Sequence, residues 1–309
     1  MGCRLCPRNC GADRDAGETG YCGMGSRLTA ARAALHMWEE PVISGRNGSG
    51  AIFFSGCPLR CVFCQNHDIA AGKRGKEITV ERLVEIFFEL KEKGANNINL
   101  VTPTHYIPQL REAITRAKKA GFPLPFIYNT GGYEKPESLK LLEGLIDVYL
   151  PDLKYMSPVI SRKYSNAGDY FSAASEAIRE MFRQTGAPAF YREGNLSENV
   201  EYDGEEENIL IRKGVLIRHL ILPGEIQDSK NIIKYIYDTY GNHVFISIMN
   251  QYTPLANVNA FPELSRKVTE QEYDEVVNYA IDIGVENGFI QEGDTAKESF
   301  IPEFDNEGV

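Results

Sequence analysis

The stretch from Ala51 to Asn66, AIFFSGCPLRCVFCQN, constrains this chain more than any other part of the sequence. Its apolar run predicts a buried strand that ends at Ser55-Gly56. Three cysteines follow with C-x3-C-x2-C spacing, at Cys57, Cys61 and Cys64. We therefore expect a buried strand followed by a loop that carries three neighbouring thiols.

Three thiols in one short loop indicate a metal site with an open position. A 4Fe-4S cluster has four iron corners that are normally held by four thiolates, so three cysteines leave one iron without a protein ligand. Catalytic zinc sites likewise keep one position open for water or substrate. Two other interpretations remain open on spacing alone: a zinc site completed by His67, and reduced thiols packed in a core.

The remaining cysteines lie near the N-terminus, at Cys3, Cys6, Cys10 and Cys22. Four thiolates can close a tetrahedral zinc site or hold an iron-sulfur cluster. Only Cys3 and Cys6 form a C-x2-C pair, whereas the usual zinc ribbon has two such pairs. We expect a second metal centre here, with zinc and iron-sulfur both open and with a structural or electron-relay role.

Composition excludes several classes of protein. At 309 residues and 43% hydrophobic content, the chain suits about two average domains or one large α/β barrel with an appendage. A net charge of -10 argues against nucleic acid as a partner. No apolar run approaches the roughly 20 residues of a membrane span, and residues 1–22 lack a signal-peptide pattern. The odd number of cysteines, all before residue 65, favours metal binding in a reducing compartment, so we expect a cytoplasmic protein.

After the cysteine loop, predicted strands and helices alternate. Helices begin at the Thr79 cap, at Pro108 and at the capping box Thr269–Glu272. Further helices are predicted at 136–142, 172–184 and 228–240, and the strands at 51–54, 98–101, 125–128, 146–150, 215–222 and 244–249. This alternation predicts a parallel sheet with helices outside. Six strands are too few for a complete eight-stranded barrel, and no G-x-G-x-x-G follows the first, so we expect a partial TIM-like barrel.

The sequence suggests two regions. We expect a cysteine-rich segment and connector over residues 1–48 and the partial barrel over residues 49–309. Trp38, in the connector, is expected to be a packing residue without a function. Residues 187–212 read as a solvated hairpin insertion near the entrance to the site, because they are rich in acidic residues: Glu193, Glu198, Glu201, Asp203, Glu205, Glu206 and Glu207.

Polar residues collect after the predicted strands, where a parallel barrel places its site. They are Thr102, Thr104, His105, Asn129, Thr130, Asp152, Lys154, Arg218, His219, Asn250, Gln251 and Tyr252. Turn preferences explain some of them. Asp152 and Lys154, however, face one side of their strand, and Arg218 lies within an apolar strand, where an unpaired charge costs several kcal/mol, roughly. Arg218 therefore needs an anionic partner, and a cofactor carboxylate would serve.

The cysteine loop, with Phe63 directly before Cys64, resembles the signature of the radical S-adenosylmethionine (SAM) enzymes. The segments that follow narrow this resemblance to the pyruvate formate-lyase activating enzyme family and its uncharacterised relatives with an extra N-terminal cysteine segment. They are Asn129-Thr130, Asp147–Lys154, Ile217–Gly224, Gly288–Glu292 and Phe300–Phe304. The resemblance covers essentially the whole chain. It departs after the second strand, where Val101–His105 replaces the family's G-G-E segment.

The resemblance implies a (β/α)6 barrel, a 4Fe-4S cluster on Cys57, Cys61 and Cys64, and reductive cleavage of SAM to a 5'-deoxyadenosyl radical. An electron donor such as flavodoxin or ferredoxin is then needed. The expected SAM contacts are Phe63, Thr102, Thr104, Asn129, Thr130, Asp152, Lys154, Arg218 and Asn250. The expected hydrogen donor is a glycine of a partner glycyl-radical protein. A small metabolite or a peptide is the alternative, and a non-catalytic iron-sulfur or zinc protein is an alternative of another class.

Overall fold

One mixed sheet organises the chain. The computed structural model describes residues 2–202, 204, 206, 208–255, 258–290 and 302–309. In these residues the strands follow the order β11-β10-β9-β6-β5-β4-β2-β1-β3, with β7 and β8 attached beside β9. The strands are β1 (Leu28–His36), β2 (Ser49–Phe54), β3 (Lys76–Ile78), β4 (Ile98–Val101), β5 (Phe126–Thr130), β6 (Val148–Pro151), β7 (Ala189–Arg192), β8 (Asn195–Val200), β9 (Ile209–Leu220), β10 (Phe245–Met249) and β11 (Gly288–Ile290).

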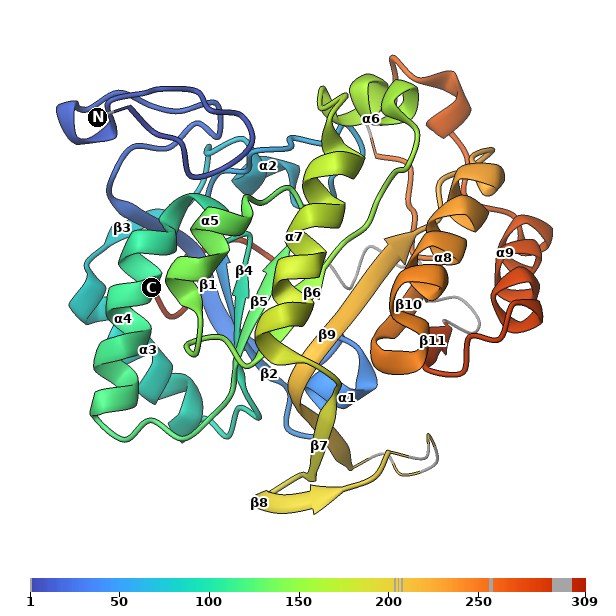
Figure 1. Cartoon of the computed structure of the whole chain (residues 1–309). Coiled ribbons are helices and arrows are strands. Elements are labelled where there is room, and N and C mark those ends of the chain that lie inside the picture. The colour runs from blue at the N-terminus through green and yellow to red at the C-terminus, as the bar shows by residue number, and fades with distance from the viewer. Residues whose placement is uncertain (1, 203, 205, 207, 256–257, 291–301) are drawn as a thin grey trace.

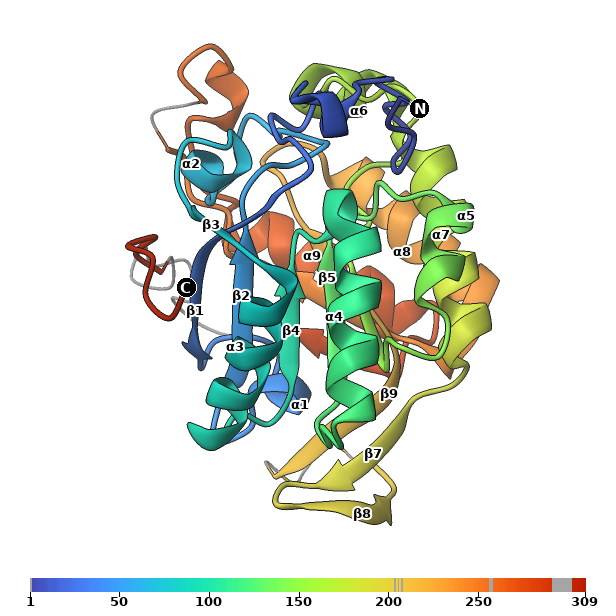
Figure 2. The same ribbon diagram turned by 90° about the vertical axis from the view of Figure 1, so that its left-hand side faces the viewer.

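The larger helices lie outside the curved sheet, as Figures 1 and 2 show. The α-helices are α1 (Pro41–Ser44), α2 (His67–Ala70), α3 (Val80–Glu92), α4 (Ile107–Lys119), α5 (Pro136–Leu139), α6 (Pro158–Ser165), α7 (Tyr170–Thr185), α8 (Ile226–Tyr240) and α9 (Glu270–Asp282). Short 3-10 turns are η1 (Arg14–Ala16), η2 (Thr104–Tyr106), η3 (Lys140–Leu142), η4 (Gly241–His243) and η6 (Pro262–Leu264).

Neighbouring strands from β2 to β11 pair in parallel, which confirms the expected partial barrel. The sheet is not closed, because its order ends at β11 on one side and at β3 on the other. All six residues of β2 are buried, as expected for a strand that is covered on both faces. On the outside, α3 is capped by Thr79, whose side chain accepts from Arg82 N, and it buries Leu83, Ile86, Phe87 and Leu90 on one face.

Two parts of the sheet differ from the sequence prediction. The expected connector before residue 49 is not a simple linker, because β1 pairs antiparallel with β2 along most of its length. The alanine-rich sequence of β1 gives little local strand signal, so long-range pairing decides its conformation. β11, which pairs parallel with β10, adds a parallel strand beyond the six expected in this part of the chain.

The acidic insertion forms a hairpin, as expected, but it does not lie near the site. β7 pairs antiparallel with residues 209–213, the N-terminal part of β9, whereas Arg218 lies near the C-terminal end of that strand. The hairpin therefore projects from the end of the barrel opposite α2 and α6 (Figures 1 and 2). The expectation of an insertion at the entrance is wrong, because β9 begins before Val215 and carries the hairpin away. Its Asp203, Glu205 and Glu207 lie outside the described residues.

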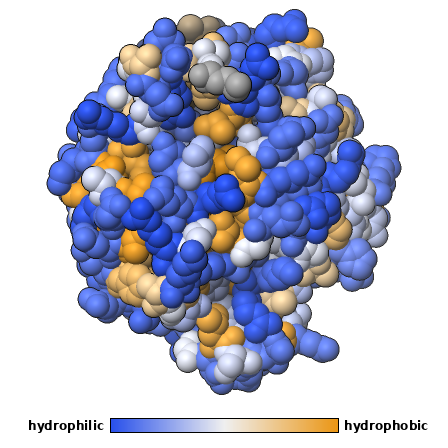
Figure 3. Space-filling view, turned by 60° about the vertical axis from the view of Figure 1, so that its left-hand side comes forward, coloured by the Kyte–Doolittle hydropathy of each residue, from blue (hydrophilic) through white to orange (hydrophobic). Residues whose placement is uncertain are grey.

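The N-terminal segment covers the same end of the barrel as α2 and α6 (Figure 1). The lateral face that comes forward between the views of Figures 1 and 2 is mostly hydrophilic, with hydrophobic patches between (Figure 3). The C-terminal residues 302–309 lie beside β1. Ala33 N donates to Glu307 O at 2.8 Å, and Asn306 N donates to Ala31 O at 3.0 Å.

Of the C-terminal motifs, residues 291–292 and 300–301 lie outside the described residues. Within the described residues, no helix has the length and hydropathy of a membrane span.

Candidate functional site

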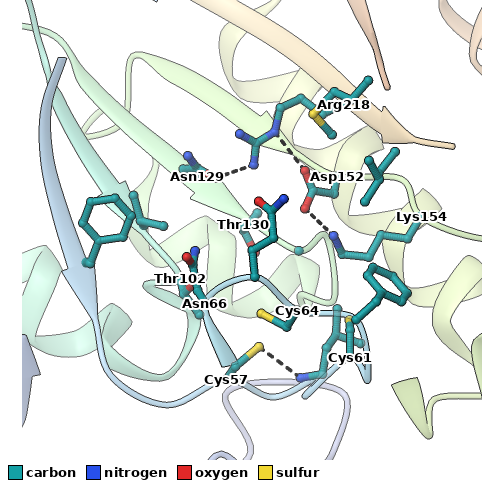
Figure 4. Close-up of a pocket in the computed structure, with 18 of the residues that line it drawn as sticks. Cys57, Cys61, Cys64, Asn66, Thr102, Asn129, Thr130, Asp152, Lys154 and Arg218 are labelled. Carbon is teal, nitrogen blue, oxygen red and sulfur yellow. Dashed lines mark hydrogen bonds and ion pairs between the residues drawn. The ribbon is translucent and has the colours of Figure 1, made fainter. Parts of the chain in front are cut away.

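A cavity of about 240 Å³ lies at the carboxyl ends of the parallel strands (Figure 4). Its wall brings together almost all the residues that were predicted from the sequence: Cys57, Cys61, Phe63, Cys64, Thr102, Thr104, Asn129, Thr130, Asp152, Lys154 and Arg218. Asn250 is not among the lining residues, although its neighbours Met249 and Gln251 are. The predicted site residues thus share one cavity, and their contacts with SAM stay predictions.

The cysteine loop is held in place by backbone hydrogen bonds. Gly56 N donates to Ile69 O at 2.7 Å, and Val62 N donates to Tyr164 O at 2.9 Å. Gly56 has a φ of +87°, a left-handed conformation that favours glycine at the point where the chain leaves β2. These bonds turn all three thiols toward the cavity that also contains Asp152 and Arg218 (Figure 4).

The three thiols suit a cluster better than a single ion. Among the described residues, no group of three or more His, Cys, Asp or Glu side chains is placed to hold one metal ion. In a cubane cluster each thiolate binds a different iron, so the three sulfurs need not converge on one point. His67 does not line the cavity, and its Nε2 lies 3.3 Å from Asp68 Oδ1, so the zinc interpretation gains no support.

The thiols of Cys57 and Cys64 are protonated when no metal is bound. Burial raises the pKa of Cys57 to about 11, and negative charge on the neighbouring Cys61 sulfur adds to this rise. Burial also raises the pKa of Cys64, with further contributions from Cys61 and Cys57. A metal must therefore displace these protons when it binds, which makes its affinity pH-dependent.

Across the cavity from the thiols lies a network of charged side chains (Figure 4). Arg218 Nε donates to Asp152 Oδ1 at 2.9 Å, and its two other nitrogens donate to Glu39 Oε2 at 3.2 Å and to Asn129 Oδ1 at 2.7 Å. Lys154 Nζ donates to the second oxygen of Asp152 at 2.6 Å. The protein thus supplies the anionic partners that Arg218 requires, and a cofactor carboxylate is not needed for that purpose.

The pKa directions agree with this pairing. Burial alone would raise the pKa of Asp152, but the charges of Arg218 and Lys154 outweigh it and lower that pKa. For Glu39, burial outweighs the attraction of Arg218, so its pKa is raised. Glu39 was not predicted from the sequence, because a carboxylate beside a tryptophan gives no local signal of burial against a distant arginine.

The segment that replaces G-G-E has an unusual backbone. Thr102 has a φ of +59°, which is an outlier for a β-branched residue, and its N–H donates to Asn129 O at 2.9 Å. The hydroxyl of Thr104 donates to Glu134 Oε1 at 2.6 Å, and that of Thr130 donates to the same oxygen. Glu134 was not predicted from the sequence. Burial raises its pKa to about 7, although both threonines oppose the rise.

Trp38 was expected to be a packing residue, but the structure places it at the surface. It is 64% exposed and lines the cavity together with His36, Phe53 and Pro302. A large exposed aromatic side chain at a cavity edge is typical of a binding surface. The sequence prediction was wrong here, because the exposure of Trp38 depends on where the open side of the barrel lies.

The four N-terminal cysteines lie in one neighbourhood. A methyl group added to Gly20 would lie 3.1 Å from Cys10 Sγ and 3.5 Å from Cys22 Sγ. Burial raises the pKa of Cys6 to about 12, and charges on Cys22 and Cys3 contribute to the rise. Cys6 and Cys22 are buried, whereas Cys10 is exposed. The backbone also brings Cys22 close to the other cysteine set, because Cys22 O would lie 2.9 Å from a methyl group on Gly56.

Comparison with known proteins defines the class of this domain. Residues 51–188, which contain most of β2, the cysteine loop and the strands β4, β5 and β6, match the Radical SAM superfamily. The chain therefore contains a radical SAM domain.

A curated relative and three solved structures were also found. The chain is 25% identical over 289 residues to the uncharacterized protein MJ0674 of Methanocaldococcus jannaschii, covering 90% of this chain and 74% of that protein. Methylornithine synthase (PylB) has a TM-score of 0.51 at 14% identity, over 84% of this chain and 65% of PylB. The FeFe-hydrogenase maturase HydG of Carboxydothermus hydrogenoformans has a TM-score of 0.51 at 14% identity, over 79% of this chain and 54% of HydG.

The third structure is Streptococcus suis SuiB bound to its precursor peptide SuiA, with a TM-score of 0.50 at 10% identity, over 77% of this chain and 47% of SuiB. This chain therefore spans only about half the length of SuiB and HydG. At such low identity these three structures support the fold alone.

Proposed function

We propose that this protein is a radical SAM enzyme that binds a 4Fe-4S cluster at Cys57, Cys61 and Cys64 and abstracts hydrogen from a glycine of a protein or peptide. When bound, the cluster supplies the electron that cleaves SAM into methionine and a 5'-deoxyadenosyl radical. The observation that carries the proposal is that one cavity joins three neighbouring thiols to the charged network of Asp152, Lys154 and Arg218.

The residues of the chain have separate roles in this proposal. The thiols hold the cluster, and Asp152 and Asn129 offer oxygen atoms to the cationic groups of SAM. Lys154 and Arg218 offer N–H donors to its carboxylate and ribose oxygens, while the protein carboxylates keep both side chains oriented. Phe63 packs edge-on against Tyr155, Tyr164 and Tyr252, with ring centroids 6.2–6.5 Å apart, which excludes water from that wall.

A polypeptide substrate is favoured by the open side of the barrel. The sheet is not closed, and Trp38 lies exposed at the edge of the cavity. The acidic hairpin, which could have restricted access, lies at the other end of the barrel. SuiB, a protein of similar fold, has been solved with a precursor peptide bound. A small metabolite remains the alternative substrate.

Two experiments test this proposal. The protein is reconstituted anaerobically with iron and sulfide and reduced with dithionite or with flavodoxin or ferredoxin, and 5'-deoxyadenosine is measured by chromatography. We expect product from the wild type and none from Cys61→Ala, with the exposed change Glu137→Gln, outside the cavity, as the control. Product formation by Cys61→Ala at the wild-type rate would contradict the catalytic role and favour a non-catalytic iron-sulfur or zinc protein.

The substrate is tested separately with a glycyl-radical protein deuterated at its glycines. We expect deuterium to appear in 5'-deoxyadenosine. If deuterium comes only from a labelled small metabolite, the polypeptide proposal is wrong and the metabolite alternative takes its place.

We further propose a second metal centre at Cys3, Cys6, Cys10 and Cys22, with zinc and iron-sulfur both open. A short segment with few buried apolar residues cannot build its own core, so a metal would supply much of its folding energy. Metal analysis should show that a Cys3→Ser/Cys6→Ser variant contains less metal per protein than the wild type, by the amount of one centre. Equal metal content in the two proteins would contradict a second site.

A further inference from the structure

A chain of two hydroxyl groups reaches Cys61 from outside the cavity. Ser165 Oγ donates to Cys61 Sγ at 3.0 Å, and the hydroxyl of Tyr155 lies 2.7 Å from Ser165 Oγ. Ser165 is 2% exposed and Tyr155 is fully buried. Neither residue lines the cavity. Ser165 therefore contacts the sulfur, and Tyr155 contacts Ser165, without occupying the space that a substrate would use.

The direction of this chain follows from the number of protons. A sulfur that binds iron is a thiolate, which accepts hydrogen bonds but donates none. The hydroxyl of Ser165 has one proton, so it donates that proton to Cys61 and accepts from Tyr155. Tyrosine carries its proton at neutral pH and can donate. Each hydroxyl thus has a partner, and the chain ends at the sulfur.

Several contacts hold Ser165 at this distance. It is the last residue of α6, and Val62 N donates to Tyr164 O at 2.9 Å, which joins the end of the helix to the cysteine loop. Arg8, from the N-terminal segment, donates to Ser165 O at 2.9 Å and to Pro58 O at 2.7 Å. One guanidinium group therefore bridges the end of α6 and the loop that contains Cys57 and Cys61.

We propose that Ser165 tunes the reduction potential of the cluster held by Cys57, Cys61 and Cys64, and that Arg8 is a positioning residue for this hydrogen bond. Hydrogen bonds to cluster sulfurs help to set the potential, because a donor stabilises the additional negative charge of the reduced state. The inference rests on the proposed cluster. It assigns to the N-terminal segment a role in positioning the loop, which does not depend on whether that segment itself binds metal.

The test is a redox titration of the reconstituted protein, followed by electron paramagnetic resonance. We expect Ser165→Ala to shift the one-electron reduction equilibrium of the cluster about tenfold toward the oxidised state. This corresponds to a midpoint potential that is ~59 mV more negative. Ser165→Thr keeps the hydroxyl and should restore the wild-type potential. Ser161→Ala is the matched control, because Ser161 is buried on the same helix and its hydroxyl has no partner among the described residues.

Arg8 is tested in the same titration. Arg8→Gln should shift the midpoint in the same direction as Ser165→Ala but by less, whereas Arg4→Gln, an exposed change in the same segment, should have no effect. An unchanged midpoint in Ser165→Ala, or an equal shift in Ser161→Ala, overturns the inference while the proposed function stands. A wild-type protein that assembles no cluster overturns both.

Discussion

Asp152 and Arg218 meet twice: their backbones form a parallel β-bridge, and Arg218 Nε donates to Asp152 Oδ1 at 2.9 Å. The bridge fixes the two side chains on neighbouring strands at the end of the sheet that faces the cavity. Glu39 completes the arrangement from the segment after β1, as a second carboxylate on the same guanidinium. The charges of the site are therefore neutralised within the protein before any ligand binds.

Replacing Arg218 should affect both stability and binding. Arg218→Ala leaves the buried carboxylate of Glu39 without its cation and leaves Asp152 with Lys154 alone, and we expect a loss of about 3–5 kcal/mol in the free energy of unfolding. SAM affinity of the folded variant should fall by about 2 kcal/mol. Urea unfolding and calorimetry measure the two effects. Lys213→Ala, an exposed change on the same strand, is the control. An exposed ion pair contributes about 1 kcal/mol or less. If Arg218→Ala is within about 1 kcal/mol of the wild type in its free energy of unfolding, the buried charge network does not stabilise the fold as predicted.

Gly56 should tolerate no side chain. A methyl group there would lie 2.2 Å from Met24 Cγ and 2.9 Å from Cys22 O, and the φ of +87° adds strain. We expect Gly56→Ala to cost about 1–2 kcal/mol for the left-handed backbone and about 1–3 kcal/mol for overpacking. Gly121→Ala, with a φ of +81° and no atom within 4 Å, isolates the backbone part. Urea unfolding measures the free energy of unfolding, and proteolysis reports on the N-terminal segment. If Gly56→Ala and Gly121→Ala lose the same free energy of unfolding, the predicted contact of residue 56 with Met24 and Cys22 is contradicted.

Glu134 should make stability depend on pH. Its pKa is about 7 in the folded protein, against an ordinary value of 4.5, because it is buried. The folded state therefore binds the proton more tightly, so the free energy of unfolding should fall as pH rises from about 4.5 to about 7, by about 3 kcal/mol, and then level off. Glu134→Gln, which cannot titrate, should give a flatter profile. The exposed Glu137→Gln is the control, and identical profiles for wild type and Glu134→Gln would refute the prediction.

Trp38 should affect the substrate and not the cleavage of SAM. Trp38→Ala removes an exposed aromatic surface at the cavity edge, worth about 0.5–1.5 kcal/mol, so we expect KM for a polypeptide substrate to rise roughly 2–10-fold. Trp38→Phe should recover part of the loss. Met37→Ala, an exposed neighbour that does not line the cavity, should have little effect. Formation of 5'-deoxyadenosine without substrate should be the same in all variants, and a selective loss of that activity in Trp38→Ala would assign the residue to the cofactor instead.

The sequence by itself determined the position of three neighbouring thiols after a buried strand and most of the fold. Cys57, Cys61 and Cys64 are neighbours along the chain, so their shared position follows from local spacing. The periodicity of residues such as Leu83 and Phe87 likewise predicts a helix without knowledge of its partners. Asp152, Lys154 and Arg218 could be selected because charges at the ends of apolar strands are costly unless they are paired.

Only the tertiary structure decided which groups pair with these residues. Glu39 reaches Arg218, and Ser165 reaches Cys61, across more than a hundred residues of sequence, and Arg8 reaches Pro58 across 50. Such contacts depend on strand register and on the packing of helix ends, which no local pattern encodes. The same reason explains the position of the hairpin at the far end of the barrel and the exposure of Trp38. Both depend on how distant segments pack and on which surfaces they leave in contact with solvent.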